Sequence, residues 1–292
     1  MANLKEVKSR ISSVTSTQQI TSAMKMVAAA KLRRAQDRIT QMRPYSQKLT
    51  SILQNVSANL GDASDNPFGE DREGSNVLLV VISSDRGLCG AFNSNVFKET
   101  IRLIEKKYSY EKKSGGLSIL PIGKKSYEYF KKRGFQVIDD HYGMFHDLSF
   151  DTAKAAAEEV MEGFADGQFD KVELIYNEFK NVATQILRTE QFLPIEPSDS
   201  DDVEDVDYIY EPSMEYVVKE LIPKSLKIQF YKAVLESNAS EHGARMTAMD
   251  QATDNAGELL KELKLTYNRT RQAAITKEIL EIVGGAEALA AG

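Results

Sequence analysis

Residues 2–43 read ANLKEVKSRISSVTSTQQITSAMKMVAAAKLRRAQDRITQMR, a run of 42 residues without a glycine or a proline. At about 1.5 Å per residue, this run predicts a single helix about 63 Å long. Apolar residues recur at alternating steps of three and four near both of its ends, which is the spacing of a coiled-coil seam. Polar Gln18, Thr21 and Lys25 take the seam positions in the middle. Pro44 follows the run, and we expect it to disrupt the helix or to fall close to its end.

A coiled-coil seam needs a partner helix, and the C-terminal part of the chain offers one. Helix-forming sequence runs from about residue 224 to residue 283, and residues 246–267 repeat the alternating spacing of three and four. These sixty residues would form a helix about 90 Å long, and we expect Gly284, Gly285 and the Ala/Gly tail to end it. The first and last helices are therefore expected to pair as a long antiparallel coiled coil.

Two glycines, Gly243 and Gly257, lie inside this C-terminal helix. Each costs a helix about 1 kcal/mol relative to alanine. Because glycine lacks a side chain, it suits positions where another part of the chain comes close to the helix. We therefore interpret both glycines as places of close approach.

The middle of the chain has a different pattern, in which strands and helices alternate. Residues 77–82 form a continuous apolar run that is typical of a strand buried on both faces. Further strands are expected at residues 117–122, 135–139, 172–176 and 184–192, and helices at residues 92–113, 124–132 and 152–164. This alternation predicts a central Rossmann-like α/β domain. The expected domains are an N-terminal helix (1–58), a linker (59–75), the α/β domain (76–212) and a C-terminal helix (213–292).

The charged residues are distributed unevenly, although the net charge is only −6. Residues 1–48 hold ten Lys and Arg against two Asp and Glu, whereas residues 196–211 hold eight Asp and Glu and no Lys or Arg. A basic first helix suggests an acidic partner, either nucleic acid or a protein surface. That helix has no aromatic residue before Tyr45 to stack on bases, and the chain as a whole is acidic, so we expect no nucleic-acid partner.

Membrane and disulfide signals are weak. The longest apolar run, residues 77–82, is far too short to cross a bilayer, and the N-terminus lacks the apolar centre of a signal peptide. An amphipathic, arginine-bearing N-terminus also fits an organelle transit peptide. Cys89 is the single cysteine, which excludes an internal disulfide and a multi-cysteine metal site. We expect a soluble, cytosolic chain.

A search for catalytic chemistry finds no convincing constellation. The segment SILPIGKK at residues 118–125 approaches a phosphate loop, but has Ser at the first glycine position and Lys where Ser or Thr would bind magnesium. The segment DRGLCGAF at residues 85–92 follows the first strand but lacks the GxGxxG spacing, so we interpret it as a tight turn. His141, His146 and His242 lack metal-site spacing, and we expect all three to be exposed. We therefore expect no catalytic residue, no cofactor and no metal.

Four motifs of the chain resemble the gamma subunit of F-type ATP synthases. They are ITSAMKMVAAAKL (20–32), SSDRGLCGAFN (83–93), ASEHGARMTAM (239–249) and YNRTRQAAITKE (267–278). The resemblance covers nearly the whole chain and implies the non-catalytic central-stalk rotor of a proton-translocating ATP synthase. The implied partners are the alpha and beta subunits of the catalytic hexamer, the epsilon subunit and the membrane c-ring. Catalysis would take place on the beta subunits. Rotation of an asymmetric rotor would press each beta subunit in turn.

The resemblance also implies contact residues. Contacts with beta are expected at Met24, Lys25, Arg245, Arg271, Gln272, Thr276 and Glu278. Guanidinium and amide groups there suit acidic and main-chain acceptors. Tyr208 and Glu211 match the family's foot, which contacts the c-ring and the epsilon subunit. The chain lacks both a presequence and the cysteine-bearing insert of the plastid form, so we expect a bacterial protein, peripheral on the cytoplasmic face of the cell membrane, without direct bilayer insertion.

Two other interpretations stay open. One is a structural coiled-coil tether whose α/β domain binds a different partner, and the other is an enzyme with an unrecognised nucleotide site. A tether should accept changes at Arg271 and Gln272 that preserve the heptad spacing, whereas a rotor should lose torque or coupling. A nucleotide enzyme should bind ATP or NAD as an isolated chain.

Overall fold

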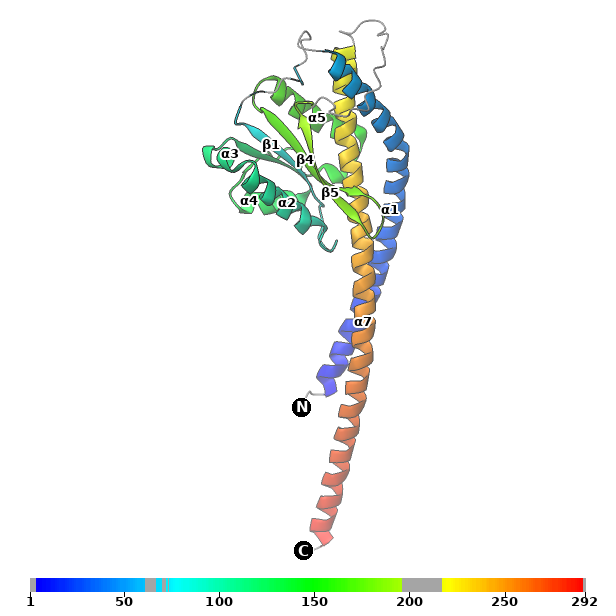
Figure 1. Cartoon of the computed structure of the whole chain (residues 1–292). Helices are drawn as coiled ribbons and strands as arrows, with labels where there is room; N and C mark the ends of the chain where they lie inside the picture. Colours follow the sequence, from blue (N-terminus) through cyan, green and yellow to red (C-terminus); the bar gives the residue numbers. More distant parts are fainter. Residues whose placement is uncertain (1–3, 61–66, 70–71, 73, 196–216, 291–292) are drawn as a thin grey trace. The chain divides into compact units, whose positions relative to one another are not determined.

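The structure is a computed structural model of the chain, and it describes residues 4–60, 67–69, 72, 74–195 and 217–290 (Figure 1). The chain divides into two compact units. The first unit combines residues 1–27 with residues 246–292, and the second comprises residues 28–245. Two long helices, α1 (Leu4–Leu60) and α7 (Ile222–Ala290), contribute residues to both units.

Helix α1 is longer than the position of its proline predicted. It continues past Pro44 as far as Leu60, so the prediction that Pro44 disrupts the helix or falls close to its end is wrong. A proline inside a helix removes one main-chain hydrogen bond and costs about 3 kcal/mol. Tertiary packing offsets this cost, because Ser46 and Leu49, which follow the proline, are both buried.

Helix α7 also extends beyond its predicted end. Pro223 is the second residue of α7, which directly follows the π-helical turn Val217–Leu221; the fixed φ angle of proline is compatible with a helix. The helix runs for 69 residues, so the prediction that Gly284 and Gly285 end it is wrong. Both glycines are exposed, and each costs a helix only about 1 kcal/mol. The segment Ala-Glu-Ala-Leu-Ala that follows is strongly helix-forming and continues the helix to Ala290.

In the first unit, α1 and α7 form an antiparallel pair with a polar centre. Thr21 and Thr253 share a hydrogen bond of 2.8 Å between their hydroxyls, and Lys25 forms an ion pair of 2.5 Å with Asp250. A Cβ atom at Gly257 would lie 3.1 Å from Nε2 of Gln18. As the residue number rises from 18 through 21 to 25 in α1, the partner's number falls from 257 through 253 to 250 in α7. The polar residues that interrupt the seam therefore each meet α7.

The second unit contains a five-stranded sheet with the strand order β3-β2-β1-β4-β5. The strands are β1 (Val77–Ile82), β2 (Leu117–Ile122), β3 (Gln136–Val137), β4 (Lys171–Phe179) and β5 (Gln185–Leu193). The first four pair in parallel, and β5 runs antiparallel to β4. All five predicted strands are present, and β1 is buried at all six positions, as its apolar run indicated. Strand β2 is also buried at all six positions.

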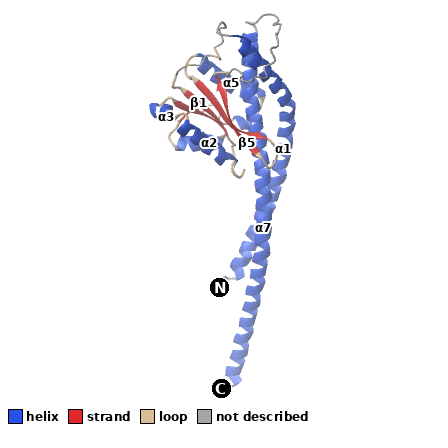
Figure 2. Ribbon diagram, in the orientation of Figure 1, coloured by secondary structure: helices blue, strands red, loops and turns tan. Residues whose placement is uncertain are grey.

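Helices cover both faces of this sheet (Figure 2). On one face lie α5 (Phe150–Ala165) and the start of α7, and on the other lie α2 (Phe92–Lys106) and α4 (Lys124–Lys132). Successive residues of β1 alternate between the two apolar layers, because side chains alternate across a strand. The result is a three-layer α/β/α domain whose core includes residues 222–234 of α7.

The helix predicted over residues 92–113 is present as two helices, α2 and α3 (Ser109–Ser114). Tyr108, between them, is buried, and its hydroxyl donates a hydrogen bond to the carboxylate of Glu173 in β4. Lys107 forms an ion pair of 2.5 Å with the same carboxylate. These contacts with a strand 65 residues further along the chain accompany the break between the two helices.

Candidate functional site

The order of the strands points to the place where an α/β domain of this kind binds a ligand. In open parallel sheets, ligands bind outside the carboxyl ends of the strands at the point where the strand order reverses. Here the chain proceeds from β1 to β2 and β3 on one side, and then returns to place β4 on the other side of β1. The reversal therefore lies between β1 and β4, and the loop that follows β1, residues 83–91, lies at that edge.

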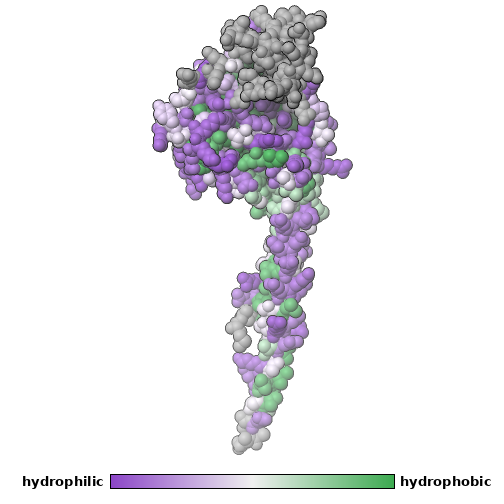
Figure 3. Space-filling view, viewed as in Figure 1, coloured by the Kyte–Doolittle hydropathy of each residue, from purple (hydrophilic) through white to green (hydrophobic). Residues whose placement is uncertain are grey.

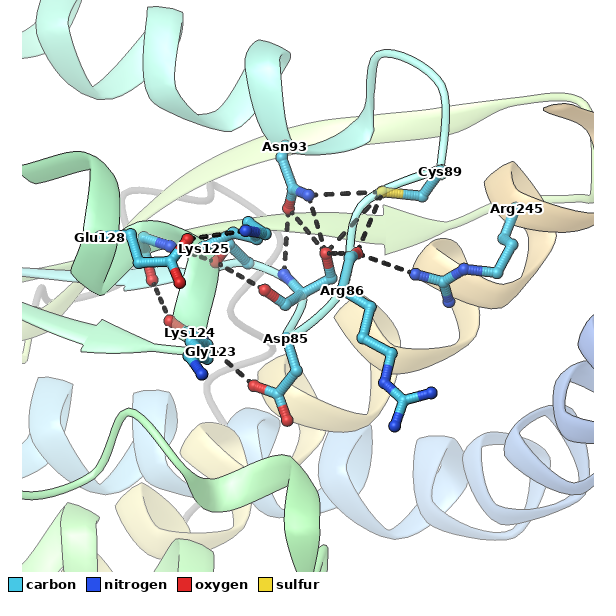
Figure 4. Close-up of polar contacts among 12 residues, drawn as sticks. Asp85, Arg86, Cys89, Asn93, Gly123, Lys124, Lys125, Glu128 and Arg245 are labelled. Carbon is cyan, nitrogen blue, oxygen red and sulfur yellow. Dashed lines mark hydrogen bonds and ion pairs between the residues drawn. The ribbon is translucent and has the colours of Figure 1, made fainter.

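The start of α4 is already bonded by this loop (Figure 4). The first N–H groups of a helix attract anions, and a phosphate group often binds there. In this chain three successive loop residues accept hydrogen bonds from three successive N–H groups of α4. They are Asp85 Oδ1 from Lys124 at 3.0 Å, the Ser84 carbonyl from Lys125 at 3.0 Å, and Ser83 Oγ from Ser126 at 2.8 Å. The phosphate-loop candidate at residues 118–125 therefore ends in N–H groups that have protein partners.

A compact network holds the loop itself. The amide nitrogen of Asn93 donates to Ser84 Oγ at 2.7 Å and to Cys89 Sγ at 3.3 Å. Ser84 Oγ in turn contacts the carbonyl of Arg86 at 2.7 Å. Burial raises the pKa of the Cys89 thiol, so the thiol stays protonated at neutral pH and is a poor nucleophile. The single cysteine thus acts as a packed part of the loop.

Leu88, at the tip of this loop, combines strain with exposure. Its φ angle is 62°, the left-handed region that favours glycine, and its side chain is 65% exposed. A single exposed leucine is ordinary, but strained backbone persists only where its surroundings enforce it, and it clusters at functional positions. Sequence reasoning missed Leu88, and the available signal was its position between Gly87 and Gly90 within a motif.

Arg245 of α7 reaches this loop from the opposite side (Figure 4). Its guanidinium donates to the carbonyls of Arg86 at 2.9 Å and Gly87 at 3.2 Å, and it forms an ion pair of 2.5 Å with Glu241. Both side chains of that pair are largely buried. The predicted contact residue Arg245 therefore holds the loop after β1 within its own chain.

Two ionisable neighbours of Arg245 are perturbed by burial. Burial raises the pKa of Glu241, while Arg245 and Lys31 act in the opposite direction. Burial also lowers the pKa of His242 to about 4, and the positive charges of Arg245 and Lys31 lower it further. His242 is only 9% exposed, so the prediction that it is exposed is wrong. The histidine lies in the face of α7 that packs against the domain, which its sequence neighbours do not reveal.

The other two histidines lie apart from this edge. His146 is exposed as predicted. His141 is only partly exposed, because its Nε2 atom lies 2.6 Å from Glu159 Oε2 of α5. Within the described residues, no three His, Cys, Asp or Glu side chains come close enough together to hold a metal ion. In the same part of the chain, no helix combines the length and apolar character needed to cross a membrane.

The remaining predicted contact residues lie in the first unit or outside the described residues. Met24 is half-buried in α1, and Lys25 forms its ion pair with Asp250 of α7. Four further residues are exposed on α7, namely Arg271, Gln272, Thr276 and Glu278. Tyr208 and Glu211 fall outside the described residues.

Apolar side chains share the exposed end of α7 with these polar residues. Figure 3 shows apolar patches among hydrophilic ones along the lower end of this helix. The residues are 47–71% exposed and comprise Ile275, Ile279, Leu280, Ile282 and Val283. The helix register places Leu4, the first described residue of α1, opposite the turn of α7 that contains Arg271. The exposed apolar residues therefore lie beyond the part of α7 that α1 covers.

Fold and site together define a class of protein. It is an α/β domain whose ligand-binding edge holds a helix of its own chain, and the two longest helices of that chain pair antiparallel. A family model described as ATP synthase matches residues 3–289. The chain is 62% identical over 293 residues to the ATP synthase gamma chain of Cytophaga hutchinsonii, with 99% of both chains covered. The chain belongs to the gamma-chain family of ATP synthases.

Solved structures agree with this assignment. A chain in the central stalk and c-ring structure of the Tetrahymena thermophila mitochondrial ATP synthase is 28% identical, with a TM-score of 0.56. That match covers 80% of this chain and 99% of the other. A chain in the Euglena gracilis mitochondrial ATP synthase shares the fold, with a TM-score of 0.68, 23% identity, and 99% and 95% of the two chains covered.

Proposed function

We propose that this gamma-family chain is the non-catalytic rotor of the central stalk, and that it couples rotation of a membrane c-ring to conformational changes of catalytic beta subunits. The observation that carries the proposal is the match to a gamma chain at 62% identity over 99% of both chains. The geometry supplies the mechanism. An antiparallel helix pair with polar cross-contacts at Thr21 and Lys25 keeps its register under a twisting load better than an apolar seam alone.

A non-catalytic role fits the carboxyl edge of the sheet. There the N–H groups of α4 bind residues of the loop after β1, and Arg245 binds the same loop from α7. These contacts use, within the chain, the groups that a nucleotide would otherwise engage. ATP would accordingly be made or hydrolysed on the beta subunits.

The proposed contact surface with the alpha and beta subunits includes the end of α7. Arg271, Gln272, Thr276 and Glu278 are exposed on the part of α7 that starts opposite Leu4, the first described residue of α1, and apolar residues lie among them. A helix that is apolar around much of its circumference needs a surrounding surface to cover it. Met24 and Lys25 of α1 are proposed as a further contact with beta.

The proposed foot lies at Tyr208 and Glu211, which would contact the c-ring and the epsilon subunit. The strongly acidic composition of residues 196–211 fits a polar protein surface rather than bilayer insertion. We propose a peripheral position on the cytoplasmic face of a bacterial cell membrane, with protons as the coupling ion.

Reconstitution tests the proposal directly. The purified chain is mixed with alpha and beta subunits from the same source, and ATP hydrolysis is compared with that of alpha and beta alone. We expect a stoichiometric complex with several-fold higher hydrolysis. The matched comparison is Arg271→Ala with Gln272→Ala, which should assemble yet hydrolyse less. A chain that binds but leaves turnover unchanged would favour the tether, and ATP binding by the isolated chain would favour the enzyme.

A further inference from the structure

Helix α7 is fastened to the carboxyl edge of the sheet at two points, Glu236 and Arg245. The side chain of Glu236 has no exposed surface, and it forms an ion pair with Arg43. Arg43 of α1 binds both of its oxygens, with Nε 2.8 Å from Oε1 and Nη2 2.9 Å from Oε2. This paired arrangement is the strongest geometry for a guanidinium and a carboxylate, and it fixes their planes relative to each other.

The same two side chains bind the end of β4. The main-chain N–H of Phe179, the last residue of β4, donates to Glu236 Oε2 at 3.0 Å. The Phe179 carbonyl accepts from Arg43 Nη2 at 2.6 Å. The carboxylate and the guanidinium thus supply the acceptor and the donor that a neighbouring strand would supply. Four hydrogen bonds join α1, α7 and β4 at one place.

Between the two fastening points, α7 lies as close to the domain as its backbone allows. A Cβ atom at Gly243 would lie 3.3 Å from the ring of Phe179 and 3.7 Å from the main chain of Val182. Close packing of this kind keeps the elements together, but apolar contact has little directional preference. Directional restraint therefore comes from the polar groups on either side, Glu236 and Arg245.

Stability alone does not explain a buried ion pair of this type. Apolar side chains of similar volume often stabilise a protein as much or more, because two charges must lose their water. What a hydrogen-bonded pair adds is a single permitted geometry. At Arg43 and Glu236 that geometry fixes how two helices and a strand are placed against one another.

We propose that Arg43, Glu236 and Arg245 are positioning residues that prevent the α/β domain from twisting on the helices. This inference rests on the proposed rotor function. Torque enters a rotor at the part that contacts the ring and leaves it at the part that contacts the catalytic subunits. If the domain could twist on its helices, part of the applied rotation would deform the contact between them and would not reach the catalytic subunits. Rigid attachment at the carboxyl edge is therefore needed for tight coupling between the ring and the catalytic subunits.

The variants are chosen to loosen the fastening while keeping the fold. Arg43→Lys keeps the positive charge but cannot bind both carboxylate oxygens and the Phe179 carbonyl in one plane. Glu236→Gln keeps the shape and removes the charge. The matched control is Arg188→Lys, which weakens the ion pair of 2.6 Å between Arg188 and Glu178 on the hairpin of β4 and β5.

The first measurement uses the isolated full-length chain in a Cys89→Ser background. Spin labels are attached to cysteines introduced by Lys98→Cys on α2 and Arg34→Cys on α1. Both positions are exposed. We expect the distribution of label distances to broaden about 1.5-fold or more in Arg43→Lys and in Glu236→Gln, because local opening follows the loss of fixed contacts. The control should match the parent. Unchanged widths in both variants, with an unchanged melting temperature, would overturn the proposal.

The second measurement uses the complex with alpha and beta subunits. A probe on the α/β domain reports angular fluctuation during the pauses of ATP-driven rotation. We expect the variance to rise about two-fold in Arg43→Lys while hydrolysis falls less than two-fold. An unchanged variance beside a broadened label distribution would refute the role in torque. If the parent chain itself failed to raise hydrolysis, the proposed function would fall, and the label measurement would still decide whether the fastening is rigid.

Discussion

Asp85 accepts a hydrogen bond of 3.0 Å from the main-chain N–H of Lys124, so a carboxylate of the chain itself lies at the start of α4. The position is the one at which α/β domains of other kinds bind phosphate. The negative charge of Asp85 complements the positive end of the helix dipole. The domain thus keeps the framework of a nucleotide-binding fold and uses its polar groups for internal contacts.

Replacing Asp85 should measure this internal capping. Asp85→Ala leaves the Lys124 N–H without its partner, and loss of a cap typically costs about 1 kcal/mol. Asp85→Asn keeps an acceptor oxygen and should cost less. Urea unfolding of both variants gives the two free energies. Equal losses in the two variants would mean that the negative charge, not the hydrogen bond, is what matters.

Strain at Leu88 predicts an unusual response to substitution. Leu88→Gly removes the steric penalty of a φ angle of 62°, which is about 1 kcal/mol, although glycine adds entropy to the unfolded chain. Leu88→Ala removes nearly the same side-chain area and keeps the penalty. We therefore expect the glycine variant to be about 0.5 kcal/mol more stable than the alanine variant in urea unfolding. Greater stability of Leu88→Ala would show that the loop is unstrained.

Local sequence signals located most of the domain. The bounds of β1, β2 and α4 match the predictions at both ends, because apolar runs and a glycine before α4 mark them directly. The helix ends predicted at Pro44, Gly284 and Gly285 are wrong, because each residue disfavours a helix by an amount that packing or strong helix formers can offset. From a single sequence, Pro and Gly are interpreted as helix breakers, because their tertiary surroundings are not known.

The carboxyl edge of the sheet was the least predictable part. Arg43 and Glu236 are separated by 193 residues, and no local sequence pattern around either residue predicts their contact. Arg245 was named as a candidate from a motif, but its actual partners, the carbonyls of Arg86 and Gly87, are main-chain atoms. Only the close-approach interpretation of Gly243 anticipated that α7 meets another element there, and the structure confirms it.

Two glycines of α7, the closely packed Gly243 and the exposed Gly285, should respond differently to replacement by alanine. Gly243→Ala would place a Cβ atom 3.3 Å from the ring of Phe179, so the gain in helix propensity of about 1 kcal/mol should be cancelled by crowding. Gly285→Ala meets open space and should stabilise the end of the helix by about that amount. Amide hydrogen exchange near each site measures both. Equal protection gains at the two positions would contradict the close approach.

Removal of Arg245 should leave a buried carboxylate without its partner. In Arg245→Ala the carboxylate of Glu241 stays buried but loses its ion-pair partner. Breaking a buried ion pair in this way costs about 3 kcal/mol of stability. Arg245→Ala with Glu241→Ala removes both charges and should recover a large part of that loss. Thermal and urea unfolding of the two variants give the comparison. If the double variant recovered none of that loss, the loss would come from the main-chain contacts of Arg245 with Arg86 and Gly87 instead.

His242 should make the chain less stable in mild acid. Its pKa is about 4 in the folded chain, against an ordinary value of 6.5, so the unfolded chain binds the proton more readily between these values. The stability that neutral His242 contributes is present above pH 6.5 and is lost as pH falls towards 4, with a span of about 3 kcal/mol. His242→Gln has no proton to take up, so its free energy of unfolding should fall less over this range, other groups being common to both. Urea unfolding at pH 7, 6, 5 and 4 gives the two curves. Their difference should grow steadily with acidity because the cause is one buried imidazole beside Arg245 and Lys31, whereas parallel curves would mean that water reaches the ring and that His242 titrates normally.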